Sequence, residues 1–212
     1  MSPFKGFERT ISFAPGGAEG KWTAGLLAQF ARDELAAAIQ RGEATRRHLR
    51  AVNGRIDAPE ESVEAPGRIV YSFDWVVQAV ITALRGFEVV VPRRSGAYAK
   101  GFIVVSQGQE VAPMALRSLK LGAPALIVNT KPYSRKIQVG AKGFETYRGT
   151  FDVVARRVRS EYPGLVTVSV RFVSLSGAYR LKYSQGRRRD RQAGSELSYP
   201  ALEIVSETIV AN

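Results

Sequence analysis

The chain has 212 residues, of which 45% are hydrophobic, so it is long and apolar enough to bury the core of one ordinary domain. It contains no cysteine, which excludes disulfides, thiolate catalysis and cysteine-ligated zinc. No apolar run approaches the roughly 20 residues that span a bilayer, and residues 1–10 lack the apolar segment of a signal peptide, so we expect no membrane partner.

The charge of the chain is strongly positive. It has 31 Lys and Arg residues against 19 Asp and Glu residues, which gives a formal net charge of +12. Such an excess favours contact with an anion: nucleic acid, a membrane surface or an acidic protein partner. The alternative is a protein that is simply basic, but the clustering of the arginines favours proximity to nucleic acid.

Residues 1–20 have the composition of an extended arm, rich in glycine and carrying Phe4, Phe7 and Phe13. Aromatic side chains on such an arm are expected to dock on a neighbouring subunit or to pack on their own domain. We therefore take these three phenylalanines as the candidate subunit interface.

The first half of the remaining chain alternates between helical and extended patterns. Apolar residues at 3.6-residue spacing predict a helix over 22–41. Strands are predicted over 46–53, which ends at the Asn53–Gly54 turn, and over 68–73. Between them, residues 58–67 are rich in Glu and Pro and are expected to form an exposed loop.

The second half contains two further helices and most of the strands. Asp74 is expected to cap a helix over 75–84 that is apolar nearly all round, and Thr150 a helix over 151–162 with one apolar face. The predicted strands cover 97–106, 125–128, 165–173, 177–183 and 201–205.

This order lacks regular β-α-β crossovers and therefore predicts an α+β fold, with a mostly antiparallel sheet packed against two or three helices. We expect residues 21–212 to form one domain after the arm, with exposed loops at 58–67 and 184–198.

The inventory of reactive side chains is poor. His48 is the only histidine, no G-x-S-x-G motif is present, and a histidine-rich metal site is excluded. Glu60, Glu61 and Glu64 fall in the predicted exposed loop and are expected to be solvated. The sequence therefore predicts no enzyme, no cofactor and no metal site, with His48 on a strand face.

The densest basic cluster lies in the predicted loop over 184–198 and consists of Arg187, Arg188, Arg189 and Arg191. Guanidinium groups match phosphate oxygens well. No base-reading motif accompanies the cluster, so at most it predicts non-specific contact with a nucleic-acid backbone. A solvated loop, or one that meets an acidic partner, is an equally weighted alternative.

A strand followed by a tight turn occupies residues 125–140. Asn129 and Pro132 are turn-forming residues, and Tyr133 supplies an apolar anchor after them. Gly140 ends the unit and is expected at positive φ. No catalytic group accompanies this turn, so we interpret it as a structural junction.

Several of these segments resemble a known family. Residues 92–98 (PRRSGAY) are similar to the Pro-x-x-Ser/Thr-Gly-x-Tyr/Leu turn of tailed-bacteriophage neck, or tail-completion, proteins. Residues 129–140 (NTKPYSRKIQVG) are similar to the Asn-x-x-Pro-Tyr-x-x-x-Ile/Val-Glu-x-Gly element of that family, and 151–162 to the helix that follows it. Residues 187–190 with 199–201 resemble the C-terminal end of a larger virion variant.

The resemblance covers roughly residues 68–205 and departs at Gln138, where the family usually has Glu. It implies a virion protein at the head–tail junction, assembled in the host cytoplasm. It also implies a homo-oligomeric ring, six- or twelve-fold, between the portal or its adaptor and the tail, with packaged double-stranded DNA in the channel. In such a ring the Arg187–Arg191 loop would face the lumen or an acidic neighbour. The competing hypothesis is a free monomer or dimer that binds nucleic acid non-specifically.

Overall fold

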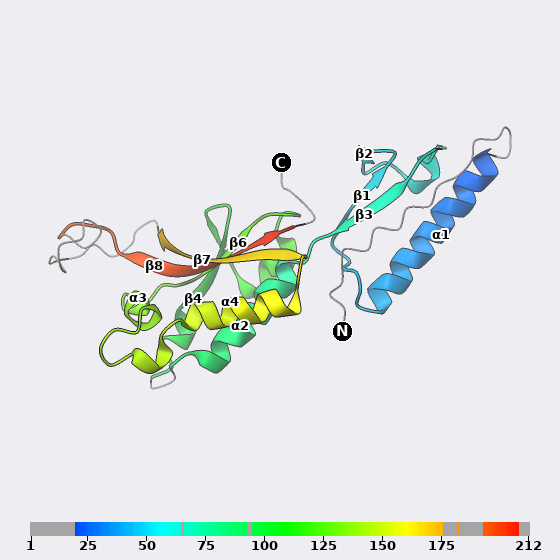
Figure 1. Cartoon of the computed structure of the whole chain (residues 1–212). Helices are drawn as coiled ribbons and strands as arrows, with labels where there is room; N and C mark the ends of the chain where they lie inside the picture. The colour runs from blue at the N-terminus through cyan, green and yellow to red at the C-terminus, as the bar shows by residue number, and fades with distance from the viewer. Residues whose placement is uncertain (1–19, 65, 93–94, 176–181, 183–192, 208–212) are drawn as a thin grey trace.

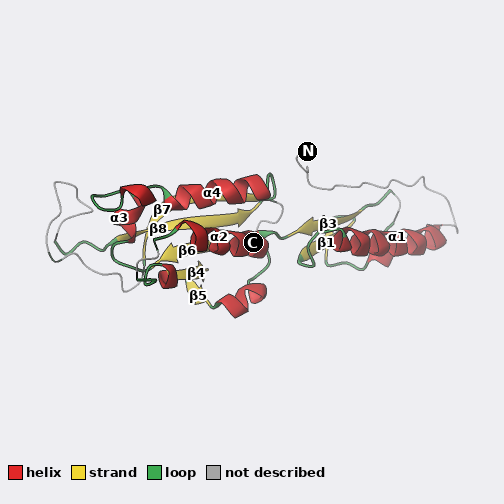
Figure 2. Ribbon diagram, turned by 90° about the horizontal axis from the view of Figure 1, so that it is seen from below, coloured by secondary structure: helices red, strands yellow, loops and turns green. Residues whose placement is uncertain are grey.

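The computed structural model describes residues 20–64, 66–92, 95–175, 182 and 193–207. These residues form two parts, each with its own antiparallel sheet (Figure 1). We call residues 20–73 the N-terminal part and residues 76–207 the main part. The molecule is elongated, with α1 of the N-terminal part at one end and α3 of the main part at the other (Figures 1 and 2).

The N-terminal part consists of one long helix beside a three-stranded sheet of order β2-β1-β3. Asn53 and Gly54 have φ angles of 50° and 79°, as the predicted turn between β1 and β2 requires. A small core of Leu27, Val52 and Val63 joins the helix to the sheet. The elements are α1 (Gly20–Gln40), β1 (His48–Val52), β2 (Arg55–Ile56), η1 (Glu60–Ser62) and β3 (Ile69–Phe73).

The expectation that residues 58–67 form an exposed loop is wrong at two positions, Glu60 and Val63. Glu61 and Glu64 are exposed, but Glu60 and Val63 are buried beneath α1. The Glu and Pro content indicated a solvated loop, whereas the apolar Val63 and the arginine partners of Glu60 draw the segment into the core.

The main part is built on a five-stranded sheet of order β5-β4-β6-β8-β7, with every pairing antiparallel. The last strand along the chain, β8, lies between β6 and β7 and forms a long ribbon with β7, from Val166 opposite Ser206 to Ser174 opposite Ser198. The strands are β4 (Phe102–Ser106), β5 (Gln109–Val111), β6 (Ala125–Asn129), β7 (Val166–Ser174) and β8 (Ser198–Ser206).

Two helices, α2 (Val76–Val90) and α4 (Thr150–Glu161), lie side by side on one face of this sheet (Figures 1 and 2). Gly86 makes their close contact possible, because a Cβ added there would lie 3.3 Å from Cγ1 of Val154. Phe87 stacks on Phe102 at 4.4 Å between ring centroids and meets Phe151 at 4.8 Å. The core of the main part is therefore aromatic at its centre.

The boundaries of two predicted elements need correction. The second helix does not end at residue 84 but continues to Val90, because Gly86 and Phe87 are buried against α4 and the sheet. The strand predicted over 97–106 begins only at Phe102, since a 3₁₀ turn, η2 (Ala99–Gly101), precedes it.

The α+β fold with antiparallel sheets is confirmed, and its strands are divided between two sheets. The main part also contains η3 (Pro113–Ser118), α3 (Ser134–Gln138) and η4 (Glu145–Tyr147). The strand predicted over 177–183 lies almost wholly outside the described residues. That residues 21–212 form a single domain stays a prediction.

Asp74 holds the two parts together and is buried. Its Oδ1 accepts the Val76 amide at 3.0 Å and so supports the start of α2, but Trp75, not Asp74 as predicted, holds the N-cap position. Its Oδ2 accepts Nη2 of Arg47 at 3.1 Å and the Gly122 amide at 3.2 Å. Arg47 also donates to the carbonyls of Arg117 at 2.7 Å and of residue 119 at 2.6 Å, so one ion pair links β1, β3, α2 and the loop before β6.

Candidate functional site

The two segments that carry the strongest resemblance fold against each other, although about thirty residues separate them. Asn129 is fully buried at the end of β6, and its Nδ2 donates to the carbonyl of Tyr98 at 2.8 Å. Its Oδ1 accepts the Lys131 amide at 3.1 Å, and the Thr130 amide donates to the carbonyl of Gly101 at 2.9 Å. The predicted Asn129 turn therefore also ties residues 95–101 to residues 129–131.

Aromatic packing reinforces this contact. The ring of Tyr98 lies 5.9 Å from that of Tyr133, and Tyr133 stacks on Phe144 at 6.5 Å. Burial raises the pKa of Tyr98 above its usual value, so its hydroxyl stays protonated. Gly101 leaves no space for a Cβ, which would lie 2.8 Å from Oδ1 of Asn129. Pro132, the remaining motif residue of this turn, is exposed just before α3.

Gly140 has φ of +64°, which confirms the predicted positive φ. It ends α3, and its amide donates to the carbonyl of Ile137 at 3.1 Å. A Cβ at Gly140 would lie 2.7 Å from Cβ of Arg148, so the aliphatic stem of that arginine crosses the glycine. Glycine is required here both for its backbone angle and for this contact.

Gln138, the position at which the chain departs from the family pattern, caps helix α4. Its Oε1 accepts the Phe151 amide at 3.0 Å, and its Nε2 donates to Oδ2 of Asp152 at 2.7 Å. Thr150 was predicted to cap this helix, but it does not. Its hydroxyl donates to the carbonyl of Tyr147 at 2.5 Å, and Gly149 holds the N-cap position.

Sequence reasoning missed the role of Gln138 because a helix cap is sought within a few residues of the helix start. This acceptor lies 13 residues upstream and reaches α4 only through the fold. The one available signal was the amide at a position where the family has a carboxylate.

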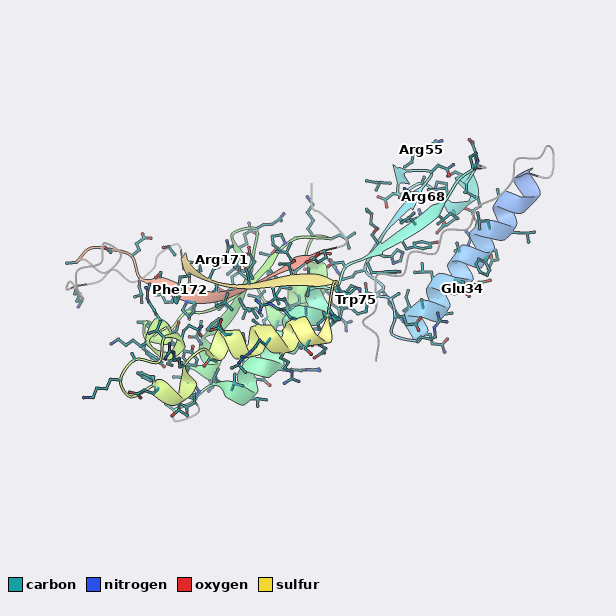
Figure 3. All side chains as sticks on the ribbon, in the orientation of Figure 1. Glu34, Arg55, Arg68, Trp75, Arg171 and Phe172 are labelled. Carbon is teal, nitrogen blue, oxygen red and sulfur yellow. The ribbon has the colours of Figure 1, made fainter. Side chains whose placement is uncertain are left out.

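We call residues 129–149 the α3 corner. It lies at the end of the main part, beside the end of the β7–β8 ribbon (Figures 1 and 3). Arg135 donates to the Ser198 hydroxyl, and its guanidinium lies 4.7 Å from the ring centroid of Phe172. Arg171 pairs with Glu203 across the ribbon at 2.8 Å. The ribbon and the corner are thus connected by side chains at the root of the segment that contains the arginine cluster.

The α3 corner is strongly basic. Residues 131–148 contain five Lys and Arg residues and a single carboxylate, Glu145. Both oxygens of Glu145 accept the Gly143 amide, at 3.0 and 2.9 Å. Hydrogen bonds from the backbone amides of Glu145 and Gly143 lower the pKa of the Glu145 carboxyl, so this group stays ionised. It is directed at the backbone.

The charge of the whole chain is distributed unevenly between the two parts. Residues 20–74 contain eight basic and eight acidic side chains, whereas residues 75–175 contain 15 basic and five acidic ones. In the N-terminal part many arginines have carboxylate partners: Arg41 with Glu43 at 2.9 Å, and Arg50 with Glu60 at 2.9 Å. The positive surplus therefore belongs to the main part.

Glu60 is the centre of the polar cluster in the N-terminal part. It accepts Nη1 of Arg50 and, at 3.0 Å, the hydroxyl of Tyr71. Burial alone would raise the pKa of Glu60, but hydrogen bonds from its own amide, Arg50 and Tyr71 outweigh it and lower the pKa. Burial and this carboxylate in turn raise the pKa of Tyr71. The role of this cluster is structural, since it holds the segment after β2 against the sheet.

His48 lies on β1, as predicted for a strand-face residue, with its ring 5.4 Å from Tyr71 and 5.9 Å from Phe73. Among the described residues, no group of three or more potential ligands is placed to hold a metal ion. Within the same residues, no helix has the length and apolar composition needed to cross a bilayer.

The other predicted site residues lie outside the described part of the chain. These are the arm residues Phe4, Phe7 and Phe13 and the arginines Arg187, Arg188, Arg189 and Arg191. Their expected roles stay predictions.

No protein-family model, curated protein or solved structure matches the chain significantly.

Proposed function

We propose that this chain is a structural protein of a tailed-phage virion, forming part of the neck or head–tail connector ring. In this role it would join the portal or its adaptor to the tail around the DNA channel. The observation that supports the proposal most is the contact between residues 95–101 and 129–140. The two short motifs on which the resemblance rests form one structural unit through Asn129 and Tyr98.

Exposed apolar side chains on the N-terminal part give independent support. Leu26 and Phe30, one helical turn apart on α1, are 62% and 43% exposed, and Ile56 on β2 is 61% exposed. Side chains at i and i+4 share one helix face, so Leu26 and Phe30 form a continuous apolar strip. A ring requires each subunit to offer one face to a different face of the next, and this strip is suited to such a contact.

The shape of the subunit fits the same role. The N-terminal part and the α3 corner lie at opposite ends of an elongated molecule (Figure 1). One end can therefore meet a neighbouring subunit while the basic end remains available for another partner. Lumenal or acidic-partner contact by the Arg187–Arg191 loop is part of the proposal.

The oligomeric state of the purified full-length chain tests the proposal. Light scattering with negative-stain imaging should reveal a closed ring, and Leu26→Asp with Phe30→Asp should dissociate it. Met114 is 96% exposed on the main part, so Met114→Asp is a matched control that should leave the ring intact. A chain that stays monomeric at high concentration and enters no particle would refute the proposal.

The basic surplus of the main part favours a second candidate, a free nucleic-acid-binding protein. It differs from the first in oligomeric state, because it predicts a monomer or dimer that binds duplexes unaided. Substituting Arg187, Arg188, Arg189 and Arg191 with Ser tests whether these arginines contact DNA in the lumen of the assembled particle. Loss of DNA retention in assembled particles supports a lumenal position, and unchanged retention argues against it.

A further inference from the structure

The α3 corner carries cations that have no ion-pair partner among the residues that the structure describes. Lys136, Lys142 and Arg148 are exposed, and in the described part of the chain none of them forms an ion pair. The two nearest carboxylates in sequence are already engaged. Glu145 accepts the Gly143 amide, and Asp152 accepts Nε2 of Gln138.

All three cations belong to residues next to Gly140, in the chain or in the fold. Lys136 and Lys142 flank it along the chain, and the stem of Arg148 crosses it. The backbone of this segment is held by its own hydrogen bonds. The Ala141 amide donates to the carbonyl of Lys136 at 2.9 Å, and the Gly149 amide to that of residue 138 at 2.9 Å. The positive charges therefore lie on a firmly folded surface.

We propose that the α3 corner is a binding surface for the phosphate backbone of duplex DNA, with Lys136, Lys142 and Arg148 as its contacts. The site is separate from the Arg187–Arg191 loop. It rests on the proposed function only in taking duplex DNA as the polyanion.

The exposure of the three side chains favours a polyanion over an acidic protein. An exposed cation gains only about 0–1 kcal/mol from a single carboxylate. Duplex DNA carries one charge per roughly 1.7 Å and holds condensed counterions, and each neutralised phosphate releases some of them. Exposed cations without local partners gain most from that release. Base reading is not implied, since phosphate contacts carry no sequence information.

The experiment measures binding of a random-sequence duplex to the full-length chain by fluorescence anisotropy across a salt series. The test variant is Lys136→Gln, Lys142→Gln and Arg148→Gln, in which glutamine keeps part of each aliphatic stem. The control variant is Arg46→Gln, Arg55→Gln and Arg68→Gln, which removes the same charge from exposed sites of the N-terminal part (Figure 3 labels Arg55 and Arg68).

The logarithm of the association constant falls linearly with the logarithm of the salt concentration, and we expect the test variant to make this slope less steep by about 2–3. We also expect its affinity to fall by about tenfold or more. The affinity of the control variant should stay within about twofold of that of the unmodified chain. Equal losses in both variants would reduce the effect to net charge and overturn the proposal. So would unchanged binding by the test variant, absence of duplex binding, or tighter binding of a poly-glutamate peptide than of DNA.

If Arg148→Gln disturbs the fold, as far-UV circular dichroism would reveal, the pair Lys136→Gln and Lys142→Gln retains the test with an expected slope change of about 2. Light scattering on the same samples measures the oligomeric state, so the proposal of a DNA-binding surface can be tested separately from the proposal of a ring. A ring whose test variant binds DNA normally overturns the DNA surface alone. A monomer that binds through the corner overturns the ring alone.

Discussion

Replacing Gln138 with Glu is the sharpest test of how the α3 corner is fastened to α4. The new carboxylate could still accept the Phe151 amide, but it would face Oδ2 of Asp152 where Nε2 of the glutamine now donates at 2.7 Å. A hydrogen bond to a charged acceptor, worth about 1.5–3 kcal/mol, would be exchanged for repulsion between like charges. At an effective dielectric constant of about 20 and a separation of about 4 Å, that repulsion is about 4 kcal/mol.

Proton uptake sets an upper limit to the damage. A proton shared by the two carboxyls restores a donor between them, and taking it up at pH 7 costs at most about 3.7 kcal/mol for a group whose pKa is about 4.3 when unfolded. The carboxylate at the start of α4 also gains about 0.3–1 kcal/mol from the helix dipole. We therefore expect a loss of about 2–3 kcal/mol at pH 7.

The sign of the pH dependence follows from the direction of the pKa shift. Repulsion raises the pKa of the carboxyl pair in the folded variant above the unfolded value. The destabilisation is therefore present above the folded pKa and disappears as the pH falls toward about 4. Urea unfolding followed at 222 nm, at pH 7 and at pH 4.5, measures both values.

A second substitution tests the geometry directly. Adding Asp152→Asn to Gln138→Glu restores one amide and one carboxylate with their places exchanged, and should recover most of the stability lost at pH 7. A loss of equal size at both pH values, or no recovery in the double variant, would refute the account of Gln138 as the partner of Asp152.

Three further predictions concern stability. Gly140→Ala should cost at least about 1–2 kcal/mol more than Gly143→Ala, because both glycines have positive φ but only Gly140 lacks space for a Cβ; equal urea midpoints would contradict this. Asp74→Asn should cost about 3 kcal/mol, because it leaves the guanidinium of Arg47 without its carboxylate partner. A loss under about 1 kcal/mol in the same assay would show that the ion pair is dispensable. The pKa of Glu60 is lowered in the folded state, so Glu60 should stabilise the fold above about pH 4.3, and this stabilisation should be lost as the pH falls through the pKa of the folded state. Glu60→Gln should lack this acid-induced loss. If the unfolding free energies of the two proteins ran parallel between about pH 3 and 6, the idea would be excluded.

Local patterns in the sequence were sufficient for much of the secondary structure. Helical periodicity predicted α1 and α4, alternation predicted β7, and the Asn53–Gly54 pair predicted a hairpin. The positive φ of Gly140 was also predictable, since turn chemistry depends on neighbouring residues. The antiparallel α+β class followed from the order of these elements.

Contacts between residues distant in the chain were decided only by the tertiary structure. The placement of β8 between β6 and β7, the burial of Glu60 beneath α1, and the capping of α4 by Gln138 all join segments with no shared local pattern. The meeting of Asn129 with Tyr98 belongs to the same class. A sequence determines which residues can donate, accept or pack, but which of them become partners depends on how the whole chain fills its core, because close packing leaves few alternatives.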